Sequence, residues 1–227
     1  MPDRRVRRAT AADDEALGAL HRRVFPHYPS SALGESFATA LLRSYRLRSD
    51  VLVLVAEHID DPDGYLVAAP REAQRAVNLG LRGRAVRAAL TRAWRPATRS
   101  QLVTPAVRAR VRGAGPLRRR PPAVATPGSG TGKEGPTPGG SAVPYRVILI
   151  GVDPGARGQG VADGLLVTFA EEARRRGHRS AELVVASDNV VAHRCYERNG
   201  WRAVEDEPAG TGSSRYGLDL AAGQRSF

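Results

Sequence analysis

The chain has 227 residues, the length of one domain with room for a large insertion. Apolar residues make up 41% of it, enough for a hydrophobic core, and no apolar run reaches the roughly 18 residues of a membrane span. The first ten residues, MPDRRVRRAT, contain no apolar signal core, which predicts a cytoplasmic protein. The single cysteine, Cys195, excludes intrachain disulfides, and the five histidines show no metal-ligand spacing, so we expect no metal site.

The formal net charge of +12 is concentrated in one segment. Residues 71–143 contain fifteen Lys and Arg residues and two acids, Glu72 and Glu134, whereas the rest of the chain is close to neutral. Lys133 is the only lysine, so the charge is almost entirely arginine, which also fits a GC-rich coding sequence.

The first 70 residues predict a strand, two helices and a hairpin. Thr10 followed by Asp13 has the spacing of a capping box, and the helix after it places Leu17, Leu20 and Val24 on one face. Two apolar runs around the sequence DDPDG predict a hairpin with a turn at 60–64. The other expected elements are a strand at 5–10, a loop at 25–34, a helix at 35–45, and strands at 51–58 and 65–70.

The middle of the chain divides into two parts. Residues 71–112 read as arginine-rich helices broken near Pro96 and Pro105. Residues 113–142 are rich in Pro, Gly, Ser and Thr and poor in apolar residues, which predicts a disordered linker.

Regular structure is expected again after the linker, in alternating strands and helices. A glycine-rich turn, GVDPGARGQG, separates the first strand from the first helix, and Gly200 has the position of a helix-ending glycine. The expected elements are strands at 145–152, 180–186, 201–206 and 214–220, and helices at 160–176 and 189–200.

The glycine-rich turn has the features of an anion site. A helix that begins there has unpaired N–H groups and the positive end of its dipole in the first turn. Gly158 and Gly160 would let a bulky anion approach the backbone, and Arg157 adds a positive charge. The spacing is neither that of a P-loop nor that of a dinucleotide-binding fingerprint. On these residues alone, a simple tight strand-to-helix connection stays an equal alternative.

Two sequence blocks resemble the GNAT N-acetyltransferase superfamily. The block VDPGARGQGVA at 152–162 resembles the family's Arg/Gln-x-x-Gly-x-Gly/Ala loop, as Arg157-x-x-Gly160-x-Ala162. The block DNVVAHRCYERNGW at 188–201 resembles the family's second block, whose characteristic positions are filled here by Asn189, Ala192, Tyr196, Glu197, Gly200 and Trp201. The resemblance is close over 145–220, extends in layout to 5–70 and does not cover 71–143.

This resemblance implies the fold and a division of the chain. The implied fold is α/β, a mixed and mostly antiparallel twisted sheet flanked by helices, with a basic insertion between the third and fourth strands. Residues 1–70 would form the N-terminal, acceptor-side part and 143–227 the acetyl-CoA-binding part. The helical insertion at 71–112 and the linker at 113–142 would lie between them.

The resemblance also implies acetyl-CoA as acyl donor and a set of residues that bind it. Ile150 and Val152 would pair with the pantetheine arm through their backbone, and Asn189 would hydrogen-bond to that arm. The pyrophosphate cradle would be made of Arg157, Gly158, Gln159, Gly160, Val161 and Ala162.

Tyr196 has the position of the family's general acid. A phenol has a pKa near that of a thiol, so it can protonate a departing thiolate. A core aromatic side chain is the alternative interpretation. The resemblance places the oxyanion next to a backbone N–H of strand 147–152, for which Val152 is the first candidate.

The general base stays open. Many relatives have a glutamate early in the strand before the loop, where this chain has Arg146. Glu182, Glu57 and Glu35 are alternatives, as is a water chain.

Three other features near these blocks carry weaker expectations. A covalent acyl-enzyme on Cys195 is disfavoured, because no His–Asp pair is placed to activate the thiol. His193 is expected at the surface rather than as a base. The loop at 25–31 lies where relatives bind the acceptor, so His27, Tyr28 and Ser30 are candidate contacts, and a plain surface loop is equally compatible.

Several functions therefore stay open. The first is N-acetylation of a primary amine on a small molecule, such as an amino sugar or an antibiotic-like compound, in a ternary complex. The others are acetylation of protein N-termini or lysines, and a non-catalytic module that senses acetyl-CoA or binds nucleic acid. The basic insertion could be a solvated helical segment, an acceptor lid, or a surface for nucleic acid or anionic membrane. A homodimer is also compatible with the sequence.

Overall fold

A computed structural model of the chain describes residues 4–59, 61–92, 143–204 and 212–221. Within these ranges seven strands form one sheet in the order β1-β2-β3-β4-β5-β7-β6. Neighbouring strands run antiparallel except β4 and β5, which are parallel, so the expected mixed and mostly antiparallel α/β sheet is confirmed. The strands are β1 (Arg4–Arg8), β2 (Leu52–His58), β3 (Asp61–Ala69), β4 (Tyr145–Val152), β5 (Ser180–Ala186), β6 (Arg202–Val204) and β7 (Ser213–Asp219).

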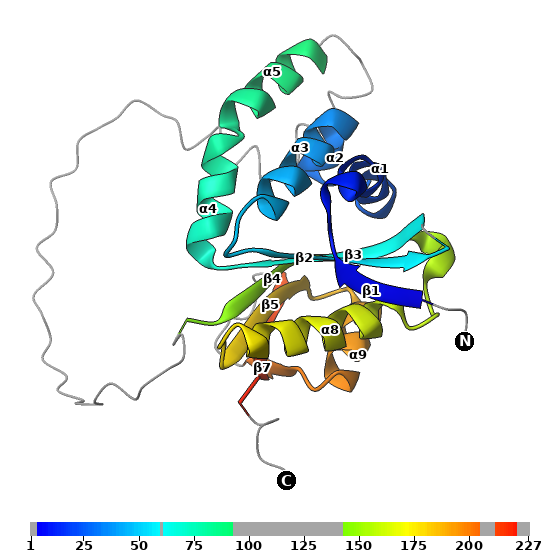
Figure 1. Cartoon of the computed structure of the whole chain (residues 1–227), viewed down its shortest axis with the longest axis vertical. Coiled ribbons are helices and arrows are strands. Elements are labelled where there is room, and N and C mark those ends of the chain that lie inside the picture. The colour runs from blue at the N-terminus through cyan, green and yellow to red at the C-terminus, as the bar shows by residue number, and fades with distance from the viewer. Residues whose placement is uncertain (1–3, 60, 93–142, 205–211, 222–227) are drawn as a thin grey trace, which may run out of the picture.

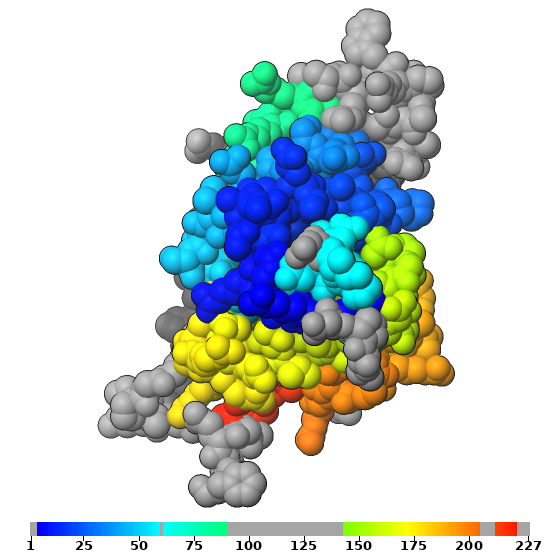
Figure 2. Space-filling view, turned by 45° about the vertical axis from the view of Figure 1, so that its right-hand side comes forward, coloured from blue at the N-terminus to red at the C-terminus, as the bar shows by residue number. Residues whose placement is uncertain are grey.

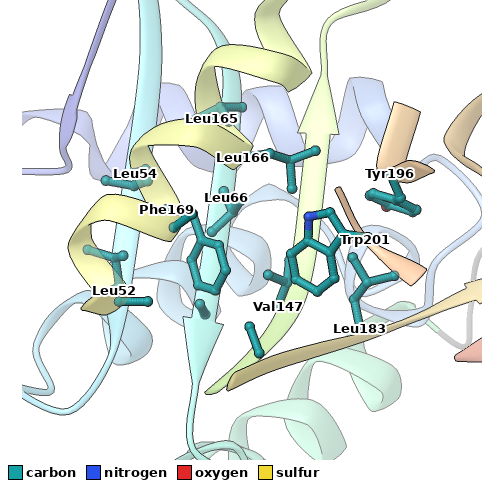
Figure 3. Close-up of a cluster of buried hydrophobic side chains, with 14 of the residues drawn as sticks. Leu52, Leu54, Leu66, Val147, Leu165, Leu166, Phe169, Leu183, Tyr196 and Trp201 are labelled. Atoms are coloured by element: carbon teal, nitrogen blue, oxygen red, sulfur yellow. The ribbon is translucent and has the colours of Figure 1, made fainter. Parts of the chain in front are cut away.

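Helices cover both faces of this sheet (Figure 1). On one face α8 (Val161–Arg175) buries Leu165 and Phe169 against Leu54 and Leu66, as Figure 3 shows. On the other face α1 (Asp14–Val24) and α3 (Glu35–Arg46) pack on side chains of β2 and β3 that point the opposite way, such as Val53 and Val67. The continuous apolar runs of β2 and β3 are explained by this burial on both faces.

The start of α1 confirms the expected capping box. The carboxylate of Asp13 accepts a hydrogen bond from the backbone N–H of Thr10 at 2.5 Å and ion-pairs with Arg7. The chain first makes a short 3-10 turn, η1 (Ala11–Asp13), before the α-helix begins. The ion pair lowers the pKa of Asp13 to about 2.

The β2–β3 hairpin is tighter than the sequence predicts. The expected turn at 60–64 is wrong, because β3 already begins at Asp61, which pairs with His58. A register shift between Ala56 and Glu57 accommodates the extra length of the second strand. Ile59 turns the chain with a φ of 51°, in the left-handed region. The polar residues 61–64 therefore extend the ladder instead of forming the turn.

The loop expected at 25–34 contains one short helix, α2 (Pro29–Ala32). Pro29 stands at its first position, where the missing N–H costs nothing.

The basic insertion begins with two described helices, α4 (Arg71–Gly80) and α5 (Arg82–Arg92). Ala73, Val77 and Leu81 are buried in the same core as α1 and α3. The first part of the expected insertion is therefore packed onto the domain. The remaining helical prediction, 93–112, and the predicted linker, 113–142, lie outside the described residues.

The last third of the chain agrees with the predicted elements to within one or two residues in the described ranges. A short 3-10 turn, η2 (Pro154–Ala156), precedes α8, and α9 (Val190–Arg198) joins β5 to β6. The helices of the described ranges include none that is long and apolar enough to cross a membrane.

Candidate functional site

The two central strands of the sheet separate part of the way along their length. The parallel pairing of β4 with β5 ends at Val147 and Leu183. On its other side β4 stays paired with β3 as far as Val152, and β5 stays paired with β7 as far as Ala186. Beyond Val147 and Leu183, the facing edges of β4 and β5 therefore have no strand partner in the described structure.

The hydrogen bonds of β4 show which backbone groups face this opening. The N–H of Asp153 donates to the carbonyl of Asp63 at 2.8 Å, so it points toward β3. Because N–H and C=O groups alternate in direction along a strand, those of Gly151 also point toward β3. The backbone groups of Ile150 and Val152 then point away from β3, into the opening. The side chain of Arg157 reaches the carbonyl of Val152 at 3.4 Å from that side.

A bulge in β4 lies at the point of separation. Val147 pairs with Ala68 and Leu149 with Val67, which leaves Ile148 as an extra residue. A bulge bends its strand and increases its local twist. It therefore accounts for β4 turning away from β5 one residue after their last pair.

Asp153 fixes the loop after β4 to the rest of the domain, and open space surrounds the two glycines of this loop. Asp153 accepts a hydrogen bond from the N–H of Gly155 at 3.0 Å and ion-pairs with Arg23, and both interactions lower its pKa. Gly158 and Gly160 have φ angles of 74° and 79°, and a Cβ on either would meet no atom within 4 Å. The glycines are therefore required by the backbone conformation rather than by close packing.

The side chain of Gln159 is fixed rather than free. Its amide donates to the carbonyl of Gly155 at 2.9 Å and accepts from Arg4 at 2.6 Å. Arg4 is in turn bonded to Asp63, so the loop is attached to β1 and β3.

The loop ends at the N-terminus of α8. Gly160 is the N-cap, and the first i to i−4 bond runs from the N–H of Gly164 to the carbonyl of Gly160 at 3.0 Å. The N–H groups of Val161 and Ala162 precede that bond, at the positive end of the helix dipole. The Val161 side chain is buried below, so this helix end presents backbone to the surface.

Helix α9 is attached to this same helix end. Asp163, in the first turn of α8, accepts hydrogen bonds from Arg198 at 2.9 Å and from Asn199 at 2.6 Å. Burial alone would raise the pKa of Asp163, but these bonds outweigh it and lower the pKa. In Figure 2 the segment after β4 (lime) and α9 (orange) adjoin on the same side of the surface.

Helix α9 carries the two predicted residues of the second block. Asn189 is its N-cap, and its side-chain oxygen accepts from the N–H of Ala192 at 3.2 Å. Tyr196 is buried and lies beside Trp201 and Leu183 (Figure 3), next to the point where β4 and β5 separate. Burial raises the pKa of the Tyr196 hydroxyl above its ordinary value, with smaller contributions from Cys195 and Tyr28. The hydroxyl is therefore protonated at neutral pH.

A family model and several solved structures match this arrangement. The model, described as Acetyltransferase (GNAT) family, matches residues 132–201, which include β4, the loop, α8, β5 and α9. Solved structures of that family are similar over almost the whole chain. Residues 132–201 therefore match the GNAT family model, and the chain has the fold of GNAT acetyltransferases.

Three solved structures illustrate the similarity. A GNAT-family protein of Desulfovibrio desulfuricans is 17% identical with a TM-score of 0.55, over 96% of this chain and 99% of that one. The PaiA N-acetyltransferase of Thermoplasma acidophilum, solved with coenzyme A, is 12% identical with a TM-score of 0.55, over 96% and 99%. The ribosomal-protein-S18-alanine N-acetyltransferase of Escherichia coli is 14% identical with a TM-score of 0.51, over 99% of both chains. No curated protein matches the sequence.

The opposite face of β4 is covered by aromatic side chains. A Cβ at Gly151 would lie 2.8 Å from Val24 and 3.1 Å from both Phe25 and Tyr65. The ring of Phe25 packs on Tyr28, which is 48% exposed. This aromatic group brings the loop at 25–31 against the strand that borders the opening.

Behind these rings lies a buried hydrogen-bonded network. His21 bonds to the Tyr65 hydroxyl at 2.5 Å and to the Ser30 hydroxyl at 2.7 Å. Burial lowers the pKa of His21 to about 4 and raises that of Tyr65 well above its ordinary value. His21 is therefore neutral at pH 7, with one ring nitrogen donating and the other accepting. Of the three predicted acceptor contacts, Ser30 is used in this network, Tyr28 is exposed, and no interaction of His27 supports a role.

The three carboxylates considered as general bases are all engaged in ion pairs. Glu182 bonds to Arg146 at 2.6 Å, Glu57 to Arg7 at 2.6 Å, and Glu35 to Arg22 at 3.1 Å. Glu182 pairs with Arg146 at the beginning of β4, which is about 20 Å from Val152 at roughly 3.3 Å per residue. All three carboxylates are therefore ion-paired, and Glu182 also lies away from the opening.

Two further side chains of α9 have structural partners. Burial and the neighbouring Asp163 raise the pKa of the Cys195 thiol to about 11, so it is not a thiolate at neutral pH. His193 bonds to the Tyr216 hydroxyl at 2.8 Å and to the carbonyl of Ala186 at 3.2 Å. It thus connects α9 to the end of β5, and the surface position expected for it holds only in part.

Sequence reasoning missed the attachment of α9 to α8 through Asp163 and the network of His21. Asp163 follows the glycine loop within its first helical turn, and Arg198 and Asn199 closely follow Tyr196. A carboxylate beside the predicted anion site would repel the anion unless a cation neutralises it, and that conflict was a usable signal. The buried histidine carried no comparable signal.

Proposed function

We propose that this GNAT protein transfers an acetyl group from acetyl-CoA to a primary amine by direct attack in a ternary complex. The observation that carries the proposal is the opening between β4 and β5, whose free backbone groups at Ile150 and Val152 lead directly to the glycine loop. An extended arm can pair with the first of these features while an anion occupies the second. The solved relative from Thermoplasma acidophilum, which contains coenzyme A, supports this cofactor.

The pyrophosphate would be bound by backbone rather than by a lysine. The N–H groups of residues 157–162 lie along the loop and the first turn of α8, and the guanidinium of Arg157 adds a charge. Gln159 is bonded to Arg4 and Gly155, so its contribution would come from its N–H. Asn189 already accepts from Ala192, which leaves its side-chain NH₂ for the pantetheine arm.

Two groups would assist the transfer itself. The Tyr196 hydroxyl would donate a proton to the leaving thiolate, and its raised pKa keeps that proton in place over the working pH range. The N–H of Val152 would donate to the carbonyl oxygen as negative charge builds on it. The amine would lose its proton to water, because the nearby carboxylates are engaged in ion pairs. For an alkyl amine at pH 7 this step costs about 4 kcal/mol.

The acceptor is proposed to be a small amine, and a protein amine is the alternative enzyme function. The exposed ring of Tyr28, which packs on Phe25, is the part of this aromatic group that a compact acceptor could contact. The similar enzyme from Escherichia coli acts on an alanine of a ribosomal protein. Peptides with free N-termini are therefore included in the acceptor screen. A module that binds acetyl-CoA without turnover is the non-enzyme alternative.

The division of the chain follows the same proposal. Residues 1–70 would supply the acceptor side and 143–227 the cofactor side, joined by the insertion at 71–112 and the linker at 113–142. A cytoplasmic location is part of the same proposal. A homodimer is to be tested by light scattering.

The deciding experiment combines cofactor binding with an acceptor screen. Calorimetry measures acetyl-CoA affinity, and release of free thiol reports turnover with amino sugars, aminoglycosides, polyamines, amino acids and short peptides with free N-termini. Turnover of a small amine supports the proposal. Turnover of peptides alone replaces the acceptor class, and tight binding with no turnover of any amine supports the sensing module. Absence of acetyl-CoA binding overturns the proposal altogether.

A further inference from the structure

Arginines in the first part of the chain are neutralised by carboxylates. Every arginine between Arg4 and Arg48, except Arg5, has a carboxylate oxygen within 4 Å. The ion pairs of Arg7 with Asp13 and of Arg46 with Asp14 also link different elements. A high arginine content therefore does not by itself leave unbalanced charge on this protein.

The arginines of α4 and α5 differ from these. Arg75, Arg82, Arg84 and Arg87 are exposed, and in the described part of the chain none has a carboxylate within ion-pair distance. Arg71 has only a distant contact of 3.9 Å with Glu182. Glu72 is the one acid between residues 71 and 92. The four exposed residues, here called the arginine surface, carry positive charge that the described protein does not balance.

The arginine surface lies away from the proposed cofactor site. Figure 1 shows α4 continuing from the end of β3 and α5 extending beyond α3, whereas the loop after β4 lies at the opposite end of the sheet. Arg71 contacts Glu182, which itself pairs with Arg146 at the start of β4. A ligand on this surface would therefore bind independently of the proposed acetyl transfer.

A lipid surface is a poor match for these helices. The apolar side of α4, formed by Ala73, Val77 and Leu81, is already buried in the domain core. A helix that lies in a membrane interface needs such a side free for the acyl chains. Only Leu79 and Val86 remain as large exposed apolar residues on the described part of α4 and α5.

We propose that the arginine surface binds the phosphate backbone of a nucleic acid duplex. Guanidinium groups bond phosphate oxygens in a bidentate manner, and charges spread along two helices suit a polymer of phosphates better than one small anion. Residues 71–92 contain no aromatic side chain, so stacking on single-stranded bases has no platform here. Binding without base contacts is expected to be independent of sequence and strongly dependent on salt.

The test measures fluorescence anisotropy of a labelled 20-base-pair duplex, as DNA and as RNA, with the full chain between 50 and 250 mM KCl. The variant R75Q/R82Q/R84Q/R87Q removes the arginine surface. The control R5Q/R179Q/R194Q/R202Q removes the same charge from exposed arginines elsewhere. We expect at least tenfold weaker binding for the first variant, and a salt dependence whose slope falls by about one unit for each phosphate that is no longer bound. The control should bind within about twofold of the parent.

Melting temperatures and acetyl-CoA affinities of both variants are measured alongside, and both should match the parent. Equal losses in the two variants would mean that net charge alone attracts the duplex, and would overturn the assignment. So would parent-like binding by the first variant, or no duplex binding by the parent at 50 mM KCl. Preference of the parent for vesicles with 30% phosphatidylserine over the duplex would replace nucleic acid with a membrane as the partner.

Discussion

The two edges of β4 differ in their strand pairing. Along the edge that faces β3, pairing continues from Ala69 and Arg146 to Gly64 and Val152. Along the edge that faces β5, pairing stops at Val147 and the following backbone groups are free of strand partners in the described structure. One strand thus supports the sheet through one row of peptide groups and leaves the alternate row without a strand partner in the described structure. Changes on the closed edge should cost stability, and changes on the open edge should cost binding or turnover.

The largest effect is expected from Tyr196→Phe, at the open edge. The ring remains and the proton donor is lost, so kcat should fall by roughly 10² to 10⁴ with little change in acetyl-CoA affinity. Because burial raises the pKa of Tyr196, the parent should show no loss of kcat from its ionisation below pH 10. An unchanged kcat, measured by thiol release in a variant that melts like the parent, would mean that water and not Tyr196 protonates the leaving thiolate.

Gly160→Asp should produce the next largest effect. The position has a φ of 79° and open space for a side chain, and Asp tolerates that conformation and caps helices well, so the fold should persist. A carboxylate there would face the pyrophosphate, and acetyl-CoA affinity should fall about 100-fold, or about 2.7 kcal/mol. Gly160→Asn is the matched control without charge. If calorimetry gives the two variants the same affinity, charge at this helix end does not govern binding.

A pair of proline substitutions separates the two edges of the same strand. Ile150→Pro removes an N–H that points into the opening, so the protein should fold and acetyl-CoA affinity should fall. Leu149→Pro removes an N–H that points toward Val67 on β3, and should cost about 3 kcal/mol of unfolding free energy. Urea unfolding and calorimetry distinguish these results. Equal destabilisation by both substitutions would contradict the assignment of the two edges.

A further expected effect concerns pH and the hydrogen-bonded network of His21. The pKa of His21 is lowered to about 4 in the folded protein, below the ordinary 6.5 of an unfolded chain. The unfolded state therefore binds more protons between pH 6.5 and pH 4, so stability present above pH 6.5 is lost as the pH falls, by up to about 3 kcal/mol. His21→Gln should flatten this part of the curve while leaving acetyl-CoA affinity at pH 7 unchanged. If the variant keeps the parent's slope of unfolding free energy against pH, other groups cause the loss of stability.

The sequence was sufficient for the elements that flank the cofactor site. The runs at 145–152 and 180–186 match β4 and β5 to the residue, because both strands are apolar and end at clear turn signals. The glycines at 158 and 160 identified the loop, because left-handed backbone selects for them. Family resemblance then placed Tyr196 and Asn189 on the correct helix.

The features that the sequence did not reveal depend on tertiary contacts. Residues 61–64, expected in a turn, are part of β3, because pairing with Glu57 and His58 outweighs the local preference of Asp, Pro and Gly. The bulge at Ile148 has no local signature, since any apolar residue can occupy it. The packing of α4 required knowledge that Ala73 and Val77 meet the core of α1 and α3.

The hydrogen bonds between Asp163 and α9 connect the proposed pyrophosphate site to the proposed proton donor, Tyr196. Asp163 stands in the first turn of the helix that would hold the pyrophosphate, and its partners Arg198 and Asn199 closely follow Tyr196 in the chain. These bonds therefore link the proposed anion-binding end of α8 to the helix that carries the proposed proton donor. A movement of α8 that accompanies cofactor binding would carry the donor with it, so occupancy of the phosphate site and alignment of the hydroxyl would be thermodynamically coupled.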